Sequence, residues 1–161
     1  MSETIHQQLF GPEEYRNAVD TVIEQARRRI RIFDFNLDDG GYNSPRRDDL
    51  LRAFLLANRS ARLEVALHDT DHLTQSCPRL MSILRQFSHA VYFYQTTAQA
   101  RHVYDPFVIV DGTHYVHRFH YESPRAVMAL DDIAGAHVLE RRFEEIWQAS
   151  VPTVSATTLG L

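Results

Sequence analysis

Five side chains in the last third of the sequence have the residue types of a site that could transfer a phosphoryl group. His102 and Tyr104 are two residues apart, so they share one face of an extended strand, and either could act as a nucleophile or general base. Arg118 and His120 share a face in the same way, and Arg118 could clamp an anion. With Asp111 between the two pairs, strand pairing would assemble a candidate catalytic site. The alternative interpretation is that these are half-buried strand residues with ordinary cross-strand hydrogen bonds.

Polar side chains also follow two predicted strands. Asp34 and Asn36 end the first of these strands, and His68 and Asp69 come directly after the second. Ligands of open α/β folds bind at the carboxyl ends of the strands, so these four are candidate ligand-binding residues. Residues 68–72 contain two imidazoles and two carboxylates, which are metal-ligand types, but five consecutive residues rarely enclose a metal on their own. We therefore predict a polar rim and no metal site.

Composition excludes several classes of function. All seventeen cationic residues of the 161-residue chain are arginine, so no lysine can serve as a nucleophile, a Schiff base or a phosphate-binding ammonium. The net charge of −4 provides no basic field for nucleic acid. The apolar runs are too short to span a membrane, no secretion signal is visible, and the single cysteine, Cys77, cannot form an internal disulfide. These features predict a cytoplasmic protein without a cofactor.

The first hundred residues alternate between helical and strand patterns. A short, polar-leaning edge strand is predicted at 4–10, and strands with dense apolar, β-favouring residues are predicted at 30–35, 62–67 and 90–94. Helical patterns occur at 12–29, where three arginines are expected to close the last turn, and at 48–58 and 78–87. Residues 36–47 have the glycine, asparagine and proline content of a loop. This alternation predicts right-handed crossovers and a mostly parallel sheet with helices on both faces.

The last third has a different pattern. Residues 107–110 and 114–121 predict a hairpin, because Asp-Gly at 111–112 is a favoured turn. A further strand is predicted at 125–130, and Asp131 and Asp132 could cap a final helix. The core stripe of that helix is Ala136, Leu139, Phe143, Ile146 and Trp147. We predict one domain at 1–150 and a C-terminal tail at 151–161.

This order of elements resembles a single domain of the phospholipase D family. Val110-Asp111-Gly112 is similar to the end of the family's signature strand, and Phe143-Glu144-Glu145-Ile146-Trp147 is similar to its closing helix. The resemblance implies an α/β fold, namely a phospholipase D-like half-domain with a mixed, mostly parallel sheet flanked by helices. Bacterial domains that have this plan without the catalytic signature are the most similar.

The family signature is a histidine, a lysine two residues later and an aspartate five residues after that. With Asp111 as the aspartate, Tyr104 takes the histidine position and Pro106 takes the lysine position. Where the family has Gly-Ser and an asparagine after the turn, this chain has Arg118-Phe119-His120-Tyr121. In the family the histidine is the nucleophile and the lysine holds phosphate oxygens. A second copy of this chain could not supply the lysine either.

Two functional hypotheses follow from the resemblance and the missing signature. The first is a non-catalytic scaffold or binding module, in effect a pseudoenzyme. The second is a phosphodiesterase or phosphotransferase with a rearranged site formed by His102, Tyr104, Asp111, Arg118 and His120. Since domains of this family usually work in pairs, the resemblance implies a homodimer or a complex with another protein.

Other partners follow from charge and composition. A small phosphate-containing molecule is a candidate ligand, and no membrane is expected as a partner. The chain has five tyrosines in its C-terminal half that could stack on single-stranded nucleic acid, namely Tyr92, Tyr94, Tyr104, Tyr115 and Tyr121. Without a basic patch beside them, core packing and a protein interface are the preferred interpretations.

Overall fold

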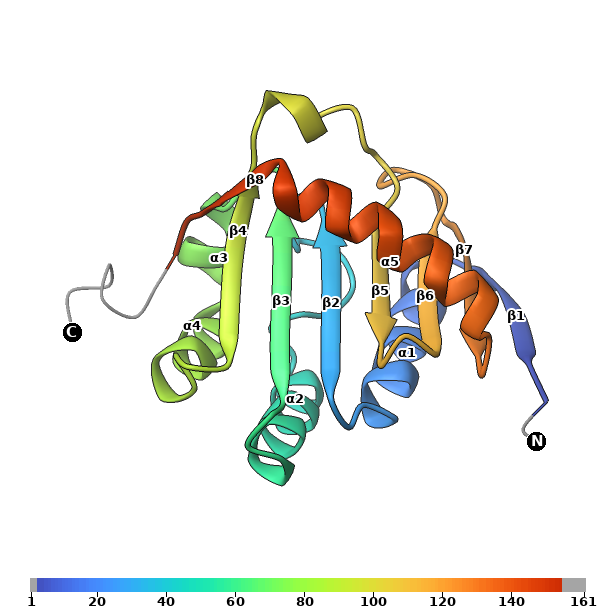
Figure 1. Cartoon of the computed structure of the whole chain (residues 1–161), viewed down its shortest axis with the longest axis horizontal. Coiled ribbons are helices and arrows are strands. Elements are labelled where there is room, and N and C mark those ends of the chain that lie inside the picture. The colour runs from blue at the N-terminus through green and yellow to red at the C-terminus, as the bar shows by residue number, and fades with distance from the viewer. Residues whose placement is uncertain (1–2, 155–161) are drawn as a thin grey trace.

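Eight strands form one mixed sheet in the computed structural model, which describes residues 3–154 (Figure 1). The strands are β1 (Ile5–Phe10), β2 (Arg29–Asp34), β3 (Arg62–Leu67), β4 (Val91–Thr96), β5 (Phe107–Val110), β6 (His114–Arg118), β7 (Arg125–Leu130) and β8 (Ser150–Pro152). Their spatial order is β1-β7-β6-β5-β2-β3-β4-β8. Of the seven pairings, only β2–β3 and β3–β4 are parallel. The α/β class and the mixed sheet are confirmed, but parallel pairing is limited to the strands of the first hundred residues.

Helices cover both faces of the sheet. They are α1 (Pro12–Glu24), α2 (Pro45–Ala57), α3 (Asp71–Ser76), α4 (Pro78–Gln86) and α5 (Ile133–Gln148), with a short 3₁₀ turn at Ala98–Ala100. Figure 1 shows α1, α2 and α4 behind the sheet and α5 running diagonally across its front. Alternate residues of each central strand therefore face different helices. Ile30 and Ile32 join the core under α1, α2 and α4, whereas Phe33 joins the core under α5.

The helix starts follow the sequence signals. Pro12 opens α1 with two glutamates in its first turn, where acidic groups favour the positive end of the helix dipole. The Ser44 side chain accepts a hydrogen bond from Arg47 N and caps α2. Asp132 caps α5 in the predicted way, since its carboxylate accepts a hydrogen bond of 3.0 Å from Gly135 N. The predicted stripe of α5 packs on the sheet.

Several predicted boundaries were wrong. Arginines 27–29 do not close α1, which ends at Glu24, and Arg29 is the first residue of β2. Residues 68–72 were expected to form a polar loop, but Asp71 and His72 begin the short helix α3. β6 ends at Arg118, so His120 is in a loop and not on a strand face. Val151 and Pro152 belong to β8 and not to a tail, and residues 155–161 of that predicted tail lie outside the described residues.

Both cores are apolar and contiguous, and none of the helices in residues 3–154 has the length and apolarity that crossing a bilayer requires. One charged pair is nonetheless enclosed between α1 and α2. The Arg47 side chain is 0% exposed, its Nε donates to Asp20 Oδ1 at 2.6 Å, and its guanidinium lies over the Tyr42 ring at 4.8 Å. This pair joins the two helices behind the sheet.

Candidate functional site at the carboxyl ends of the central strands

The direction of β5 decides which predicted site residues can meet. β5 is antiparallel to β2, with Phe107 beside Phe33 and Val110 beside Ile30. Residues that precede β5, including Tyr104, therefore lie near the carboxyl end of β2. Asp111, which follows β5, lies near the amino end of β2. Tyr104 and Asp111, which take the histidine and aspartate positions of the signature, thus lie near opposite ends of β2.

Four aromatic rings, which we call the aromatic stack, gather where β2 ends. They belong to Phe35, Tyr104, His120 and Tyr121. The Phe35 and Tyr121 rings are stacked at 4.7 Å, and the His120 and Tyr121 rings are also stacked at 4.7 Å. Tyr104 lies against His120 at 5.7 Å between ring centroids, and Tyr121 N donates to Tyr104 O at 2.8 Å. The structure therefore brings Tyr104 and His120 together, as strand pairing predicted.

Arg118 lies near this end of the sheet but is engaged by other groups. Its Nε donates to Ser123 O at 2.7 Å and its Nη1 donates to Asp39 Oδ2 at 3.0 Å. Its guanidinium also lies 5.4 Å from the centre of the Tyr15 ring, and the side chain is only 13% exposed. An anion would have to displace Asp39 to be clamped by Arg118.

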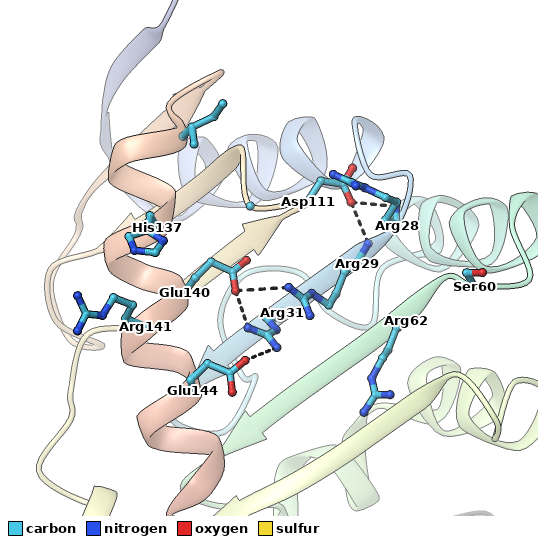
Figure 2. A pocket seen from close by; sticks show the side chains of 12 residues that line it. Arg28, Arg29, Arg31, Ser60, Arg62, Asp111, His137, Glu140, Arg141 and Glu144 are labelled. Carbon is cyan, nitrogen blue, oxygen red and sulfur yellow. Dashed lines mark hydrogen bonds and ion pairs between the residues drawn. The ribbon is translucent and has the colours of Figure 1, made fainter.

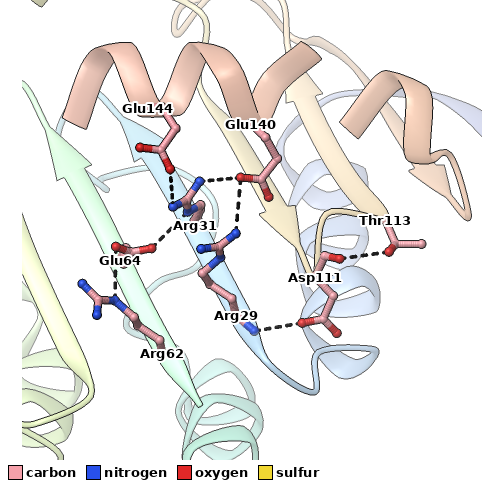
Figure 3. A network of polar contacts seen from close by, with 8 residues as sticks. All are labelled: Arg29, Arg31, Arg62, Glu64, Asp111, Thr113, Glu140 and Glu144. Atoms are coloured by element: carbon pink, nitrogen blue, oxygen red, sulfur yellow. Dashed lines mark hydrogen bonds and ion pairs between the residues drawn. The ribbon is translucent and has the colours of Figure 1, made fainter. Parts of the chain in front are cut away.

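The other two predicted catalytic residues are elsewhere. His102 lines a cavity of about 290 Å³ together with Asp105 and Arg142. Asp111 has its carboxylate turned to three backbone N–H groups, those of Arg27, Arg28 and Arg29, at 2.8–2.9 Å. Figure 3 shows the bond to the Arg29 amide beside the amino end of β2. The structure therefore does not gather all five predicted residues at one place.

His68, a predicted ligand-binding residue, has both ring nitrogens bonded within the chain. Its Nε2 lies 2.6 Å from Val103 O and its Nδ1 lies 2.5 Å from Thr96 Oγ1. Because a carbonyl can only accept, Nε2 carries the proton and Nδ1 accepts from the threonine hydroxyl. Burial lowers the pKa of His68 and favours this neutral form. His68 ties β3 and β4 to the segment that precedes β5.

The remaining rim residues differ in environment. Asn36 Oδ1 accepts from Asp38 N at 3.0 Å, and Asp69 Oδ1 accepts from Asp71 N at 2.8 Å, so both stabilise local turns. Asp34 is 6% exposed, and burial raises its pKa to about 7, against the opposing effect of the hydrogen bond from Phe35 N. A buried carboxyl that titrates near neutrality at a strand end is a frequent feature of functional sites.

No group of three or more histidine, cysteine or acidic side chains is placed to hold a metal within residues 3–154.

Residues 11–159 match the family described as "Domain of unknown function (DUF7931)". The chain belongs to this family. No curated protein matches the sequence of this DUF7931 domain significantly.

Solved structures show the fold of the domain. Nuc from Salmonella typhimurium, a phospholipase D family member, is 17% identical with a TM-score of 0.68, and the match covers 95% of this chain and 100% of that one. NucT from Helicobacter pylori is 14% identical with a TM-score of 0.63, covering 94% and 100%. TrmBL2, an archaeal chromatin protein, is 12% identical with a TM-score of 0.68, covering 92% and 54%. At such identities the similarity concerns the fold, and the DUF7931 domain has a phospholipase D-like fold.

Asp111→Ala is expected to destabilise this DUF7931 domain by about 2 kcal/mol, because three backbone N–H groups lose a charged acceptor. Asp111 also has a φ of 56°, which alanine adopts less readily than aspartate or asparagine. Asp111→Asn keeps one acceptor oxygen and tolerates this φ, so it should cost at most about half as much. Urea denaturation of the three proteins measures the difference. Equal stability of Asp111→Ala and the parent would mean that this carboxylate does not hold the α1–β2 connection.

Sequence reasoning missed a charged cluster between the sheet and α5. Asp105 Oδ1 accepts from Arg142 Nη2 at 2.6 Å, and Asp105 Oδ2 accepts from His117 Nε2 at 2.7 Å. Burial opposes ionisation of Asp105, but the hydrogen bonds from Arg142 and His117 outweigh it and hold its pKa well below the usual value. The three residues come from separate elements of the DUF7931 domain, so no local sequence pattern could have joined them.

Proposed function

We propose that this domain is a non-catalytic binding module with the phospholipase D fold, and that it acts as a homodimer. The main support for this proposal is that Tyr104 and Pro106 occupy the positions of the signature histidine and lysine. Tyr104 is also part of the aromatic stack, where its ring lies against that of His120. A neutral phenol is a weak nucleophile, and proline offers no charge for phosphate oxygens.

The surrounding charges also disfavour phosphodiester chemistry. Arg118 is the cation nearest to the stack in the predicted set, and Asp39 already pairs with it. Asp34 and Asp38 add further acidic groups at this end of β2. A polyanionic substrate would therefore meet repulsion where a phospholipase D-type enzyme needs cations.

Exposed aromatic side chains support pairing with a second copy. Tyr104 is 49% exposed and Phe119, two residues before Tyr121, is 50% exposed. Large aromatic residues are enriched in the buried centres of protein interfaces. The proposed dimer covers both rings. The carboxyl end of the central strands, where ligands of open α/β folds bind, then forms the contact surface between the two copies.

A turnover assay tests the loss of catalysis. The parent protein, Tyr104→Phe and His120→Ala are incubated with bis(4-nitrophenyl) phosphate, and release of nitrophenol is followed. The proposal expects the same background rate from all three. Turnover by the parent that both substitutions abolish would contradict it and would establish the rearranged enzyme, which the Tyr104–His120 contact favours.

Sedimentation analysis tests the dimer. Phe119→Ser is expected to raise the dimer dissociation constant by about tenfold or more, since an aromatic residue near an interface centre contributes strongly. Leu56→Ser is the matched control, because Leu56 is 74% exposed on α2, on the far side of the sheet from α5. Tyr104→Phe should dimerise like the parent. A parent protein that is monomeric at all concentrations, or a dimer equally stable in Phe119→Ser, would contradict the homodimer.

A further inference from the structure

An open cleft lies at the other end of the central strands, between α5 and the amino ends of β2 and β3 (Figure 2). It exists because α5 crosses the sheet diagonally and leaves this part of the front face without a helix (Figure 1). The cleft has a volume of about 670 Å³, within the range of small-molecule sites. None of the residues predicted to bind a ligand lines it except Asp111, whose carboxylate is already bonded to backbone amides.

The floor of the cleft contains two arginines in an unfavourable arrangement. Arg29 of β2 and Arg62 of β3 are register partners in a parallel pair, so their side chains leave the same face of the sheet as direct neighbours. Like charges side by side on one sheet face destabilise the sheet unless another charge compensates them. The two side chains are 43% and 47% exposed, so both are accessible from the cleft.

The terminal nitrogens of these two arginines are largely free to bind. Arg29 Nη2 lies 3.9 Å from Glu140 Oε2, which is too far for a hydrogen bond. Arg62 uses its Nε for Glu64 Oε2 at 3.2 Å, and its guanidinium lies 4.2 Å above the Tyr92 ring. Because the contact with Tyr92 already restricts the Arg62 guanidinium, binding an anion there costs little additional side-chain entropy.

Arg31 fixes the base of the cleft (Figure 3). Its side chain is 7% exposed and hydrogen-bonds to three carboxylates, those of Glu64, Glu140 and Glu144. Arg31 therefore shares Glu140 with Arg29 and Glu64 with Arg62, so each of these acids divides its charge between a buried arginine and an exposed one. Five arginines line the cleft against Asp111, Glu140 and Glu144, and Glu64 also pairs with Arg31 and Arg62, so these groups carry an excess of one positive charge on a chain whose net charge is −4. The cleft is a local positive site on an acidic protein.

We infer that this cleft binds the phosphate group of a small phosphorylated molecule between Arg29 and Arg62. Two guanidinium forks offer more donors and charge than one carboxylate can use, whereas a phosphate monoester has three terminal oxygens and a charge near −2. The volume exceeds that of a phosphate alone, so the rest of the ligand lies toward Ile133, which is 69% exposed at the cleft wall. The site is separate from the aromatic stack and does not depend on the proposed dimer.

Calorimetric titration with phenyl phosphate, benzoate and phenol tests this inference on the full chain. We expect phenyl phosphate to bind at one site per chain and more tightly than benzoate, and phenol not to bind. Arg29→Gln and Arg62→Gln should each weaken phenyl phosphate binding by about tenfold, because each removes charge-assisted hydrogen bonds. Arg85→Gln, which removes an exposed charge from α4 on the opposite face, should leave binding unchanged.

A variant that is expected to bind phenyl phosphate more tightly excludes an effect of misfolding, because misfolding would weaken binding. Glu140→Gln removes the negative charge beside Arg29 and leaves Arg31 with two carboxylate partners, so binding should tighten by about threefold. Circular dichroism confirms the fold of each variant. The inference would be overturned if phenyl phosphate did not bind at millimolar concentration, if benzoate bound as tightly as phenyl phosphate, or if Arg29→Gln and Arg62→Gln bound phenyl phosphate as tightly as the parent protein does.

Discussion

Asp20→Ala is expected to lower the free energy of unfolding by about 3–5 kcal/mol, because it leaves the Arg47 guanidinium buried without a counter-charge. Arg47 is 0% exposed and Asp20 is 8% exposed. Their hydrogen bond of 2.6 Å is the charge-neutralising contact within the helical layer behind the sheet. Within residues 3–154, Arg47 Nη1 has no hydrogen-bond partner even before the substitution, so little remains to compensate for the loss of Asp20.

Urea denaturation at neutral pH measures this effect, with Arg46→Met as the matched control. Arg46 is the neighbour of Arg47 on α2 and its Nε lies 3.5 Å from the same Asp20, but its side chain is 64% exposed. Exposed ion pairs contribute little, so Arg46→Met should cost less than about 1 kcal/mol. If Asp20→Ala cost no more than this control, the enclosed pair would not stabilise the fold.

Asp34→Asn is expected to stabilise the protein by about 2–4 kcal/mol above pH 7 and to have little effect near about pH 4. Burial raises the pKa of Asp34 to about 7 in the folded protein, well above the value of about 3.9 for an unfolded chain. Below the unfolded value, Asp34 is protonated in both states and costs nothing. As pH rises toward 7 the unfolded chain releases this proton first, so the folded state loses stability until Asp34 also ionises.

The measurement is urea denaturation of the parent and Asp34→Asn over this pH range. The two curves should converge at the acidic end and separate steadily up to about pH 7. Tyr42→Phe is the control, because it removes a buried hydroxyl near Asp34 that has no hydrogen-bond partner among the described residues; the pH dependence should remain. A constant difference between the parent and Asp34→Asn at all pH values would show that Asp34 ionises normally.

Local sequence patterns predicted most of the helices and strands, but they could not predict which strands pair with one another. β3 and β7 fall at the predicted residues, because dense β-favouring residues end there in clear turn signals. Arg29 was assigned to a helix because three arginines after a helical stripe are typical of a last turn. The expected parallel majority was wrong for a similar reason: the helix-strand alternation describes β2, β3 and β4, but the hairpin β5–β6 joins β2 antiparallel through contacts distant in sequence.

The candidate site could be predicted only in part. The Tyr104–His120 contact follows from a hairpin whose strands pair, so spacing alone indicated it. Asp111 does not join them, because the six residues of mostly extended chain between it and Tyr104 carry it to the other end of β2. The cleft arginines had a local signal that was not used: charged residues at alternate positions in two otherwise apolar strands, at Arg29 and Arg31 and at Arg62 and Glu64.

The position of β1 determines when the chain can complete its fold during synthesis. β1 occupies an edge of the sheet and pairs only with β7, with Ile5 beside Leu130. A ribosome that adds about 5–20 residues per second needs roughly 6–25 s to make the segment between these partners. During that interval the first strand has emerged without its neighbour, while β2, β3 and β4 can already pair with one another. The partners of the parallel strands therefore become available before the partner of β1 does, and we expect β1 to be the last of the early strands to be protected.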